Sequence, residues 1–289
     1  MVDAPAVDSR CSTPGAVEHR PQFEVIPLPG ALEAVIAHLP PGARVSVTSS
    51  PTQGQEASLT LAAELARAGF TAIPHLAARR IHGAAQAREM SAWMEEAGIR
   101  EAFAIAGDPA LPAGDLAGSL DLLEALHAQS PHLVAGVAGY PEGHPHAEPD
   151  AELDLLRRKA EHASYVVTQM CFTARPVIDW VRRAREAGVG LPVRPGVAGP
   201  VDLARLLRIG SRVGVGPSLS VLRRHGAGMR RLVRPGTWSP EPLLADLARD
   251  ARAAGLELAA PHVYTFNALE LTGAHWGAAP QTGSRPADL

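Results

Sequence analysis

The chain has 289 residues, 46% of them hydrophobic and 20% charged, with a formal net charge of −3. This length and apolar content suit one large domain with a buried core. The absence of a basic excess argues against nucleic acid or a membrane surface as a partner. Two cysteines cannot build a disulfide framework, and no apolar run reaches the roughly 18 residues of a membrane span. We therefore expect a cytoplasmic protein.

The two ends of the chain lack the patterns of regular elements. Residues 1–21 and 276–289 consist largely of small, polar and proline residues, so we expect a flexible arm at each end. Between them, short apolar runs alternate with longer amphipathic segments. We therefore predict a single domain over residues 22–275.

Eight short apolar runs are predicted to be β-strands. In chain order they are Phe23–Leu28, Arg44–Ser49, Thr71–Leu76, Ala102–Gly107, His132–Gly139, Tyr165–Met170, Leu191–Gly196 and Pro261–Phe266. Helices are predicted between strands, with the clearest patterns over residues 57–69, 85–98, 151–163 and 175–188. Alanine and leucine dominate these segments, and three of the four end in glycine, a common helix terminator.

The alternation of strands and helices predicts the α/β class and a (β/α)8 TIM barrel. Several runs are apolar throughout, which favours a parallel sheet covered by helices. A doubly wound open sheet is the alternative, but it usually shows a glycine-rich turn after its first strand, where this chain has Pro-Leu-Pro-Gly-Ala. Residues 210–238 fit the rhythm least, and we predict a long connection there with one helix over 217–233.

Polar residues gather where the predicted strands end, and a barrel carries its chemistry at the C-terminal ends of its strands. Singly, each has an ordinary explanation: a solvent-facing glutamate, a turn aspartate, a core histidine or a buried cysteine. Together they indicate a ligand site. They are Glu24, Thr48, Ser49, Ser50, His75, Gly107, Asp108, Tyr140, Glu142, His144, Thr168, Gln169, Cys171, Arg194, His262, Tyr264 and Asn267.

A metal site is the first hypothesis for His144 and His146, which flank a proline in the loop after the fifth strand. Helical zinc motifs place two histidines four residues apart, whereas these lie two apart and beyond the strand. No cysteine pair or clear third ligand accompanies them, so we expect no metal here.

Seven motifs occur in an order and at a spacing that resemble the methylenetetrahydrofolate reductases. They are Phe-Glu-Val-Ile-Pro (23–27), Pro-His-Leu (74–76), Gly-Asp-Pro (107–109), Ala-Gly-Tyr-Pro-Glu-Gly-His-Pro-His-Ala (138–147), Leu-Leu-Arg-Arg-Lys (155–159), Thr-Gln-Met-Cys-Phe (168–172) and Arg-Pro-Gly-Val (194–197). The resemblance extends over residues 23–267. It implies a barrel that binds flavin adenine dinucleotide (FAD) and takes electrons from NADH or NADPH. By a ping-pong cycle, such an enzyme reduces 5,10-methylenetetrahydrofolate to 5-methyltetrahydrofolate.

The resemblance also implies roles for particular residues. It makes Glu24 the general acid, Asp108 a second catalytic residue that also binds the pterin, and Gln169 a substrate-binding residue. The implied cofactor-binding residues are Thr48, His75, Ala106, Gly107, Asp108, Tyr140, His144 and Lys159.

The general acid has to protonate N10 of the substrate, which opens the five-membered ring and yields a better hydride acceptor. A carboxylic acid does this near neutral pH only when its pKa is raised. We expect burial of Glu24 among Phe23, Val25 and Ile26 to raise that pKa.

The chain departs from the family pattern around the expected cofactor. Ala106 stands where many members have an arginine, and the loop after Asp108 is shorter and lacks a tyrosine that often covers the flavin. Leu206 and Gly210 stand where the family has a glutamine and an aromatic residue, and Ala268 replaces an arginine. Binding of the flavin, the folate tail and the nicotinamide can therefore differ from the family pattern.

These departures keep alternatives open. A flavin-free relative would pass hydride directly from NAD(P)H to the folate. Two further alternatives are a metal-dependent barrel hydrolase that uses His144 and His146, and a non-catalytic folate-binding subunit. A yellow purified protein would indicate the flavin-dependent reductase. A colourless but NADH-active protein would indicate the flavin-free relative, and a zinc-containing protein would indicate the hydrolase. We expect a homo-oligomer, and an electron-supplying partner protein also stays open.

Overall fold

The structure is a computed structural model that describes residues 20–49, 54–108, 111–144, 147–202, 206 and 237–277. The predicted helix at 217–233 lies outside the described residues, as do Ser50, His146, Gly210 and nearly all of the two predicted arms.

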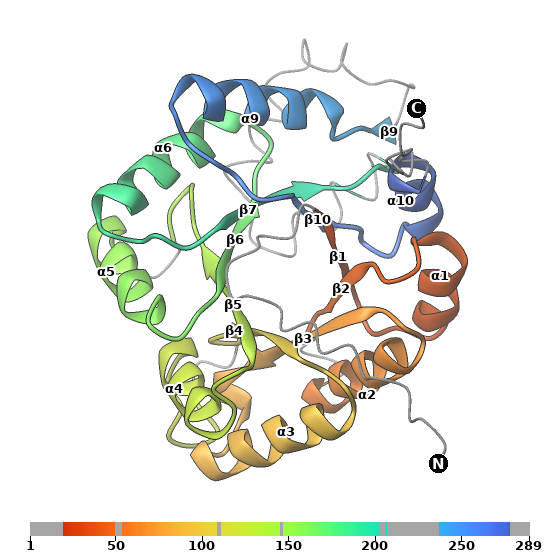
Figure 1. Ribbon diagram of the computed structural model, residues 1–289, viewed down its shortest axis with the longest axis vertical. Coiled ribbons are helices and arrows are strands. Elements are labelled where there is room, and N and C mark those ends of the chain that lie inside the picture. Colours follow the sequence, from red (N-terminus) through yellow and green to blue (C-terminus); the bar gives the residue numbers. More distant parts are fainter. Residues whose placement is uncertain are drawn as a thin grey trace, which may run out of the picture.

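Eight parallel strands close into a barrel in the order β1-β10-β7-β6-β5-β4-β3-β2 (Figure 1). All eight predicted strands form, so the predicted (β/α)8 fold is confirmed. The barrel strands are β1 (Gln22–Val25), β2 (Arg44–Val47), β3 (Thr71–Ala77), β4 (Glu101–Ile105), β5 (Val134–Gly139), β6 (Tyr165–Met170), β7 (Val193–Ala198) and β10 (His262–Tyr264).

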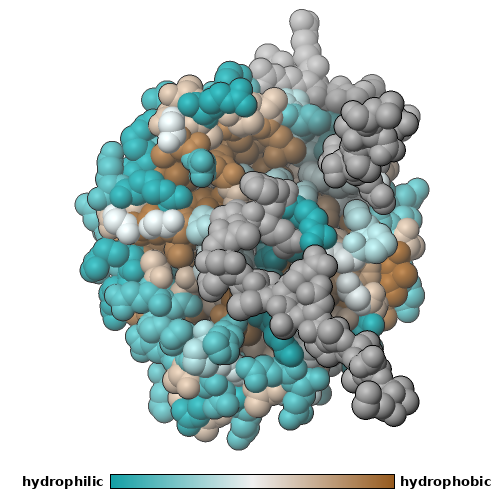
Figure 2. All heavy atoms as spheres, viewed as in Figure 1, coloured by the Kyte–Doolittle hydropathy of each residue, from teal (hydrophilic) through white to brown (hydrophobic). Residues whose placement is uncertain are grey.

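Helices surround the barrel on the outside (Figure 1). They are α1 (Ala31–His38), α2 (Gly54–Arg67), α3 (Ala84–Glu96), α4 (Ser119–Gln129), α5 (Pro149–Lys159), α6 (Ala174–Glu186), α9 (Glu241–Ala253) and α10 (Leu269–Trp276). Four of them, α2, α3, α5 and α6, match the predicted segments. The outer faces of α3, α4 and α5 are largely hydrophilic in Figure 2, as expected for helices between a core and water.

Three short elements complete the described fold. A 3-10 turn, η1 (Ala78–Arg80), follows β3, and β8 (Val201–Asp202) pairs antiparallel with β9 (Thr237–Trp238). None of the described helices is both long and apolar enough to cross a lipid bilayer.

Strand β1 shows how the sequence divides its side chains between two environments. Phe23 and Val25 are buried in the main apolar core, and the Phe23 ring packs edge-on against Trp276 of α10 with ring centroids 5.7 Å apart. Because side chains alternate along a strand, Gln22 and Glu24 point the other way, toward the interior of the barrel. The face of β1 that lines the barrel interior is therefore polar.

The opposite wall of the barrel interior is apolar. Ile73 of β3, Phe103 of β4 and Tyr165 and Val167 of β6 form a separate buried cluster. Gly136 of β5 leaves room for it, since a Cβ atom there would lie 2.5 Å from the Tyr165 ring and 2.7 Å from the Phe103 ring. The polar and apolar side chains fill the barrel together, and Glu24 of β1 and His262 of β10 lie on its polar side.

Candidate active site

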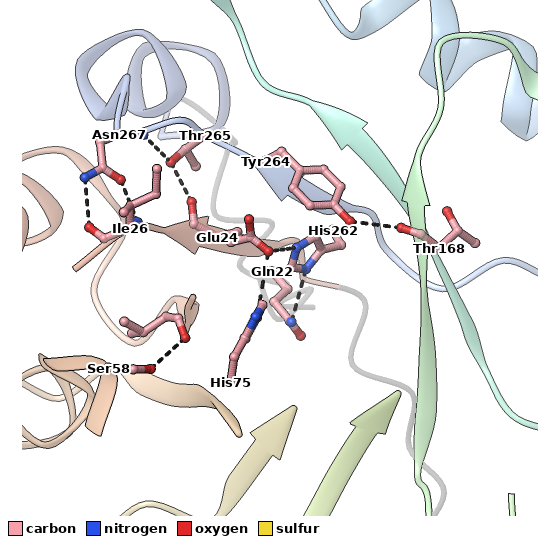
Figure 3. A network of polar contacts seen from close by, with 11 residues as sticks. Gln22, Glu24, Ile26, Ser58, His75, Thr168, His262, Tyr264, Thr265 and Asn267 are labelled. Atoms are coloured by element: carbon pink, nitrogen blue, oxygen red, sulfur yellow. Dashed lines mark hydrogen bonds and ion pairs between the residues drawn. The ribbon is translucent and has the colours of Figure 1, made fainter. Parts of the chain in front are cut away.

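Glu24 is held at the centre of a polar network (Figure 3). Its Oε2 lies 3.1 Å from Nε2 of His262 and 3.7 Å from Nε2 of His75. Its main-chain carbonyl accepts a 2.6 Å hydrogen bond from the Thr265 hydroxyl. The side chain is 17% exposed. The solvent-facing position considered for Glu24 is therefore wrong.

The expectation that Glu24 has a raised pKa is also wrong in this structure. Burial does raise the pKa of this carboxyl, but the hydrogen bond from His262 and the electrostatic interactions with His262 and His75 together lower it below its ordinary value. Sequence reasoning placed Glu24 among Phe23 and Val25, whereas those two side chains face the helices on the other side of the strand. The polar neighbours on β3 and β10 could not be read from the residues next to Glu24 in sequence.

His75 projects from β3 toward the same carboxylate. Burial is the largest influence on its pKa, which falls from 6.5 to about 4 even though the charge of Glu24 opposes the change. His75 is therefore neutral near pH 7. Its Nε2 is buried, makes no hydrogen bond with a described residue and lies 3.7 Å from Oε2 of Glu24, so this nitrogen faces the carboxylate.

Gln169 lies in an irregular part of β6. The register between β6 and β7 shifts between Val167 and Met170, which is the signature of a bulge. Gly196 of β7 comes so close that a Cβ atom would lie 2.2 Å from the Thr168 carbonyl, and the Tyr264 hydroxyl donates to that carbonyl at 3.1 Å. The buried Oε1 of Gln169 has no hydrogen-bond partner among the described residues. An orphaned acceptor of this kind indicates a ligand that donates to it.

Tyr140 and His144 are brought together by the loop that follows β5. The N–H of Gly143 donates to the Tyr140 carbonyl at 3.0 Å, and Gly143 has the left-handed φ of 91° that favours glycine. The two rings meet edge to face with centroids 4.5 Å apart. The loop therefore presents an aromatic pair rather than two independent polar side chains.

Lys159 and Glu152 share a partly buried environment on α5. Burial lowers the pKa of Lys159, and the nearby charge of Glu152 raises it in part. Burial raises the pKa of Glu152, whose Oε2 accepts a hydrogen bond from the Trp180 indole at 3.3 Å. Glu152 and Trp180 were not singled out in the sequence, because an isolated glutamate and tryptophan on helices carry no signal of their own.

The end of β4 is more open. Ala106 and Gly107 are half-buried and Asp108 is exposed. Gly107 has φ 89°, so the tight turn after β4 requires glycine, and the N–H of Arg79 anchors the turn by donating to the Ala106 carbonyl at 2.9 Å. Thr48 is half-buried just beyond β2, and its N–H donates to Val25.

Some of the predicted strand-end residues serve other purposes. Arg194 is the second residue of β7, because that strand begins two residues later than predicted. Its guanidinium donates to the main-chain carbonyls of Arg20 and Ala260, so the proposed place at the C-terminal end is wrong. Asn267 clamps β1 to the segment after β10, donating to the Ile26 carbonyl and accepting from the Ile26 N–H. Cys171 is 1% exposed, and burial raises the pKa of its thiol.

The segment that follows β7 contributes an apolar cluster beside the site. Leu206 is fully buried in it with Met170, Phe172 and Phe266. Trp238 packs edge-on against Phe172 with centroids 5.0 Å apart, and its indole donates to the Ala198 carbonyl at 3.1 Å. Among the described residues, no three or more histidine, cysteine, aspartate or glutamate side chains gather as a metal site.

Comparison with known sequences finds a matching family and several relatives. A family model described as methylenetetrahydrofolate reductase matches residues 34–215. Methylenetetrahydrofolate reductase 2 of Saccharomyces cerevisiae is 32% identical over 123 residues, which cover 38% of this chain and 20% of that protein. The probable methylenetetrahydrofolate reductase (NADPH) of Caenorhabditis elegans is 36% identical over 110 residues, covering 35% and 16%. The probable NADH enzyme of Oryza sativa is 30% identical over 119 residues, covering 35% and 20%. The chain thus spans a fifth or less of these relatives.

Proposed function

Because this chain belongs to the methylenetetrahydrofolate reductase family, we propose that it reduces 5,10-methylenetetrahydrofolate to 5-methyltetrahydrofolate with NADH or NADPH and bound FAD. One observation carries the proposal: a carboxylate inside the barrel, Glu24, is held by a hydrogen bond from His262, and Nε2 of the buried His75 lies 3.7 Å from the same carboxylate. An acid placed by hydrogen bonds inside a barrel suits proton delivery to a bound substrate.

Glu24 supplies the proton that opens the five-membered ring of the substrate at N10. Its pKa lies below the ordinary value in the structure, so the protonated form is scarce near pH 7. A pterin ring over the carboxyl would add burial, which raises the pKa of a carboxylic acid. The Glu24 carboxylate is therefore protonated most readily when the substrate covers it and when the pH falls.

Gln169 and Asp108 bind the pterin in this proposal. The unpartnered Oε1 of Gln169 accepts a hydrogen bond from a pterin N–H, and its amide NH₂ can donate. Asp108 supplies negative charge near the cation that forms on the opened substrate. Its exposure at the end of β4 leaves its carboxylate accessible to a ligand.

The residues that would hold FAD fit that group on one side of the barrel. Tyr140 and His144 offer an aromatic pair, the turn at Gly107 admits close approach of the backbone, and Lys159 provides an ammonium group for a phosphate. Thr48 and His75 complete the proposed lining. When bound, FAD supplies a carrier that accepts hydride from the nicotinamide and donates it to the folate.

A second candidate function is supported by the end of β4. Ala106 places no cation there, and the charge of Lys159 is shared with Glu152 rather than reserved for a diphosphate. These features favour the flavin-free alternative, in which the nicotinamide and the folate bind together and hydride passes directly between them. The acid Glu24 would have the same task in both cases.

The visible absorption spectrum of the purified protein, measured together with product formation, tests the proposal. We expect an oxidised-flavin spectrum that bleaches with NADH and returns when methylenetetrahydrofolate is added, with 5-methyltetrahydrofolate detected by mass spectrometry. A colourless protein that forms the product and binds no FAD on titration would establish the second candidate. Failure to form the product with either nicotinamide, in the presence of added FAD, would refute both.

A further inference from the structure

A chain of hydrogen bonds runs through the barrel from its N-terminal end to Glu24, and it involves the first residue of four strands. Arg44 of β2 binds Glu101 of β4 in a bidentate pair at 2.7 and 2.6 Å. Nη2 of Arg44 also donates to Oε1 of Gln22 at 3.3 Å. Nε2 of Gln22 lies 3.1 Å from Nδ1 of His262, whose Nε2 meets Glu24. Figure 3 shows the upper part of this chain, from Gln22 through His262 to Glu24.

The direction of every hydrogen bond in this chain follows from Arg44. A guanidinium can only donate, so the Gln22 atom that faces it must be the carbonyl oxygen. The amide NH₂ of Gln22 then faces His262, so Nδ1 must accept. A neutral imidazole that accepts at Nδ1 carries its proton on Nε2. His262 therefore donates to Oε2 of Glu24.

The pairing of Arg44 with Glu101 makes this arrangement rigid. Two parallel hydrogen bonds fix the plane of the guanidinium, and Gln22 and His262 are 0% and 1% exposed. Reversing the Gln22 amide would set two donors against each other at Arg44, and a proton moved to Nδ1 of His262 would leave Nε2 facing the Glu24 carboxylate as a second acceptor. Water cannot relieve such a conflict in a buried position, so the alternative is costly.

We propose that His262 is a positioning residue for Glu24, that Arg44 and Gln22 fix its tautomer from the far end of the barrel, and that Oε1 of Glu24 carries the transferable proton. This inference rests on the proposed role of Glu24 as the acid. Oε2 is occupied by the N–H of His262, so the carboxylic proton belongs on the other oxygen. Because the basic nitrogen of His262 faces a donor, His262 does not store the proton, and Glu24 is recharged from the ligand side.

Other titratable and charged groups around this pair come from several strands. His75 of β3 faces Glu24, and the Tyr264 ring of β10 packs edge-on against His262 with centroids 4.8 Å apart. The guanidinium groups of Arg44 and Arg194 both lie near the ring of Tyr165 on β6, with Cζ atoms 5.7 and 5.6 Å from its centroid. Only Gln22 meets Nδ1 of His262 in the described contacts, so Gln22 is the position at which the tautomer can be changed.

The direct test is nitrogen NMR of histidine-labelled protein at pH 8, with the His262 signals identified from the His262→Gln variant. The parent should show a protonated Nε2 and an unprotonated Nδ1. The variant Gln22→Glu replaces the amide with a carboxylate, which accepts from Arg44 and from a proton on Nδ1. It should therefore place a proton on Nδ1 of His262. A proton on Nδ1 in the parent, or an unchanged pattern in Gln22→Glu, would overturn the assignment.

The kinetic test measures the rate of folate reduction over a range of pH for Gln22→Glu and for the parent. If His262 becomes doubly protonated, its charge next to Glu24 should move the pH profile of folate reduction about one to three units lower. If only the tautomer changes, Nε2 of His262 becomes an acceptor. The carboxylic proton of Glu24 then sits on Oε2 in a hydrogen bond to Nε2, and Oε1 has no proton to transfer. Either change should slow folate reduction at pH 7 about tenfold or more, while NADH oxidation with an artificial acceptor stays constant. A changed tautomer with an unchanged profile would refute the positioning role.

Two controls separate this inference from folding and from the proposed function. Gln129→Glu adds the same charge at the exposed end of α4 and should change neither the tautomer nor the profile. If Gln22→Glu does not fold, Gln22→Met removes the donor at similar size, and a second tautomer of His262 should appear; its absence would count against the proposal. Full folate reduction by Glu24→Gln would refute the acid, whereas the NMR result would still decide the tautomer.

Discussion

Glu24 and its neighbours on β1 and β10 form a hydrogen-bonded network, whereas the end of β4 consists of a glycine turn with an exposed aspartate. In the first region, side chains from strands far apart in sequence fix one another. In the second, the backbone is anchored through Ala106, and the Asp108 side chain is exposed. The first region suits a proton transfer, which needs an accurate position, and the second suits a cofactor that brings many contacts of its own.

This contrast coincides with the departures from the family pattern. The expected acid lies where the network is dense, and the glutamine expected to bind the pterin lies on β6 next to Thr168, whose carbonyl accepts from Tyr264 of β10. The missing arginine at Ala106 and the short loop lie where it is sparse. Changes at the two regions should therefore have different consequences, with folate chemistry sensitive to the first and cofactor binding sensitive to the second.

The largest effect is expected for Glu24→Gln. Glutamine keeps the size and can still accept from His262, but it cannot deliver a proton. General acid catalysis is typically worth about 10²–10⁴-fold, so folate reduction should fall by a factor in that range. Oxidation of NADH with an artificial acceptor should stay near the parental rate. Stopped-flow measurement of the two half-reactions checks this.

The matched change in the other region is Asp108→Asn, which removes a charge from the end of β4. Because that charge is proposed to lie near both reaction partners, the rates of both half-reactions should change together. The change should be smaller than the loss of folate reduction in Glu24→Gln. Equal impairment of both half-reactions by Glu24→Gln would remove the contrast between the regions and refute the acid assignment.

The sequence predicted the fold well, and it predicted the candidate residues but not their surroundings. All eight strands followed from apolar runs, because strands buried in a parallel barrel need little besides apolar residues and regular spacing. The surroundings of Glu24 could not be predicted, since His75 and His262 approach from strands at distant positions in the chain. The bulge at Gln169 was also hidden, because it depends on Gly196 and Tyr264 rather than on β6 itself.

The next effect concerns stability and follows from His75. Its pKa falls from 6.5 to about 4 on folding, so below pH 6.5 the unfolded chain binds a proton that the folded chain excludes. Stability is therefore complete above pH 6.5 and is lost as the pH falls toward 4, by at most about 3 kcal/mol. His75→Asn should lose less stability over this window in urea unfolding. His132→Asn, at an exposed site, should follow the parent, and equal slopes for all three proteins would contradict the assignment.

A smaller effect is expected for Gln169→Ala, on β6 beside the dense region. Removing the amide leaves a pterin group unpaired in the complex and should cost about 1–3 kcal/mol of folate interaction. The cofactor spectrum and NADH oxidation should change little. Gln129→Ala on the outer surface of α4 is the matched control. If titration shows parental folate affinity for Gln169→Ala, the orphaned oxygen does not face the substrate.

The smallest effect is expected for Ala106→Arg, which adds to the sparse region what the family pattern has there. Ala106 is half-buried, and its carbonyl is held by the N–H of Arg79, so the new side chain starts from a fixed backbone. A guanidinium that reaches a cofactor phosphate can bind it through two hydrogen bonds. At a partly exposed site this contact is worth about 1 kcal/mol, or roughly a fivefold gain in FAD affinity by titration. Ala113→Arg, on the exposed loop nearby, adds the same charge without the position and should have no effect. An equal gain in FAD affinity for Ala106→Arg and Ala113→Arg would mean that the added positive charge attracts FAD without a specific contact. Colour in Ala106→Arg combined with a colourless but active parent would instead show that the end of β4 separates a flavin-dependent site from one that transfers hydride directly.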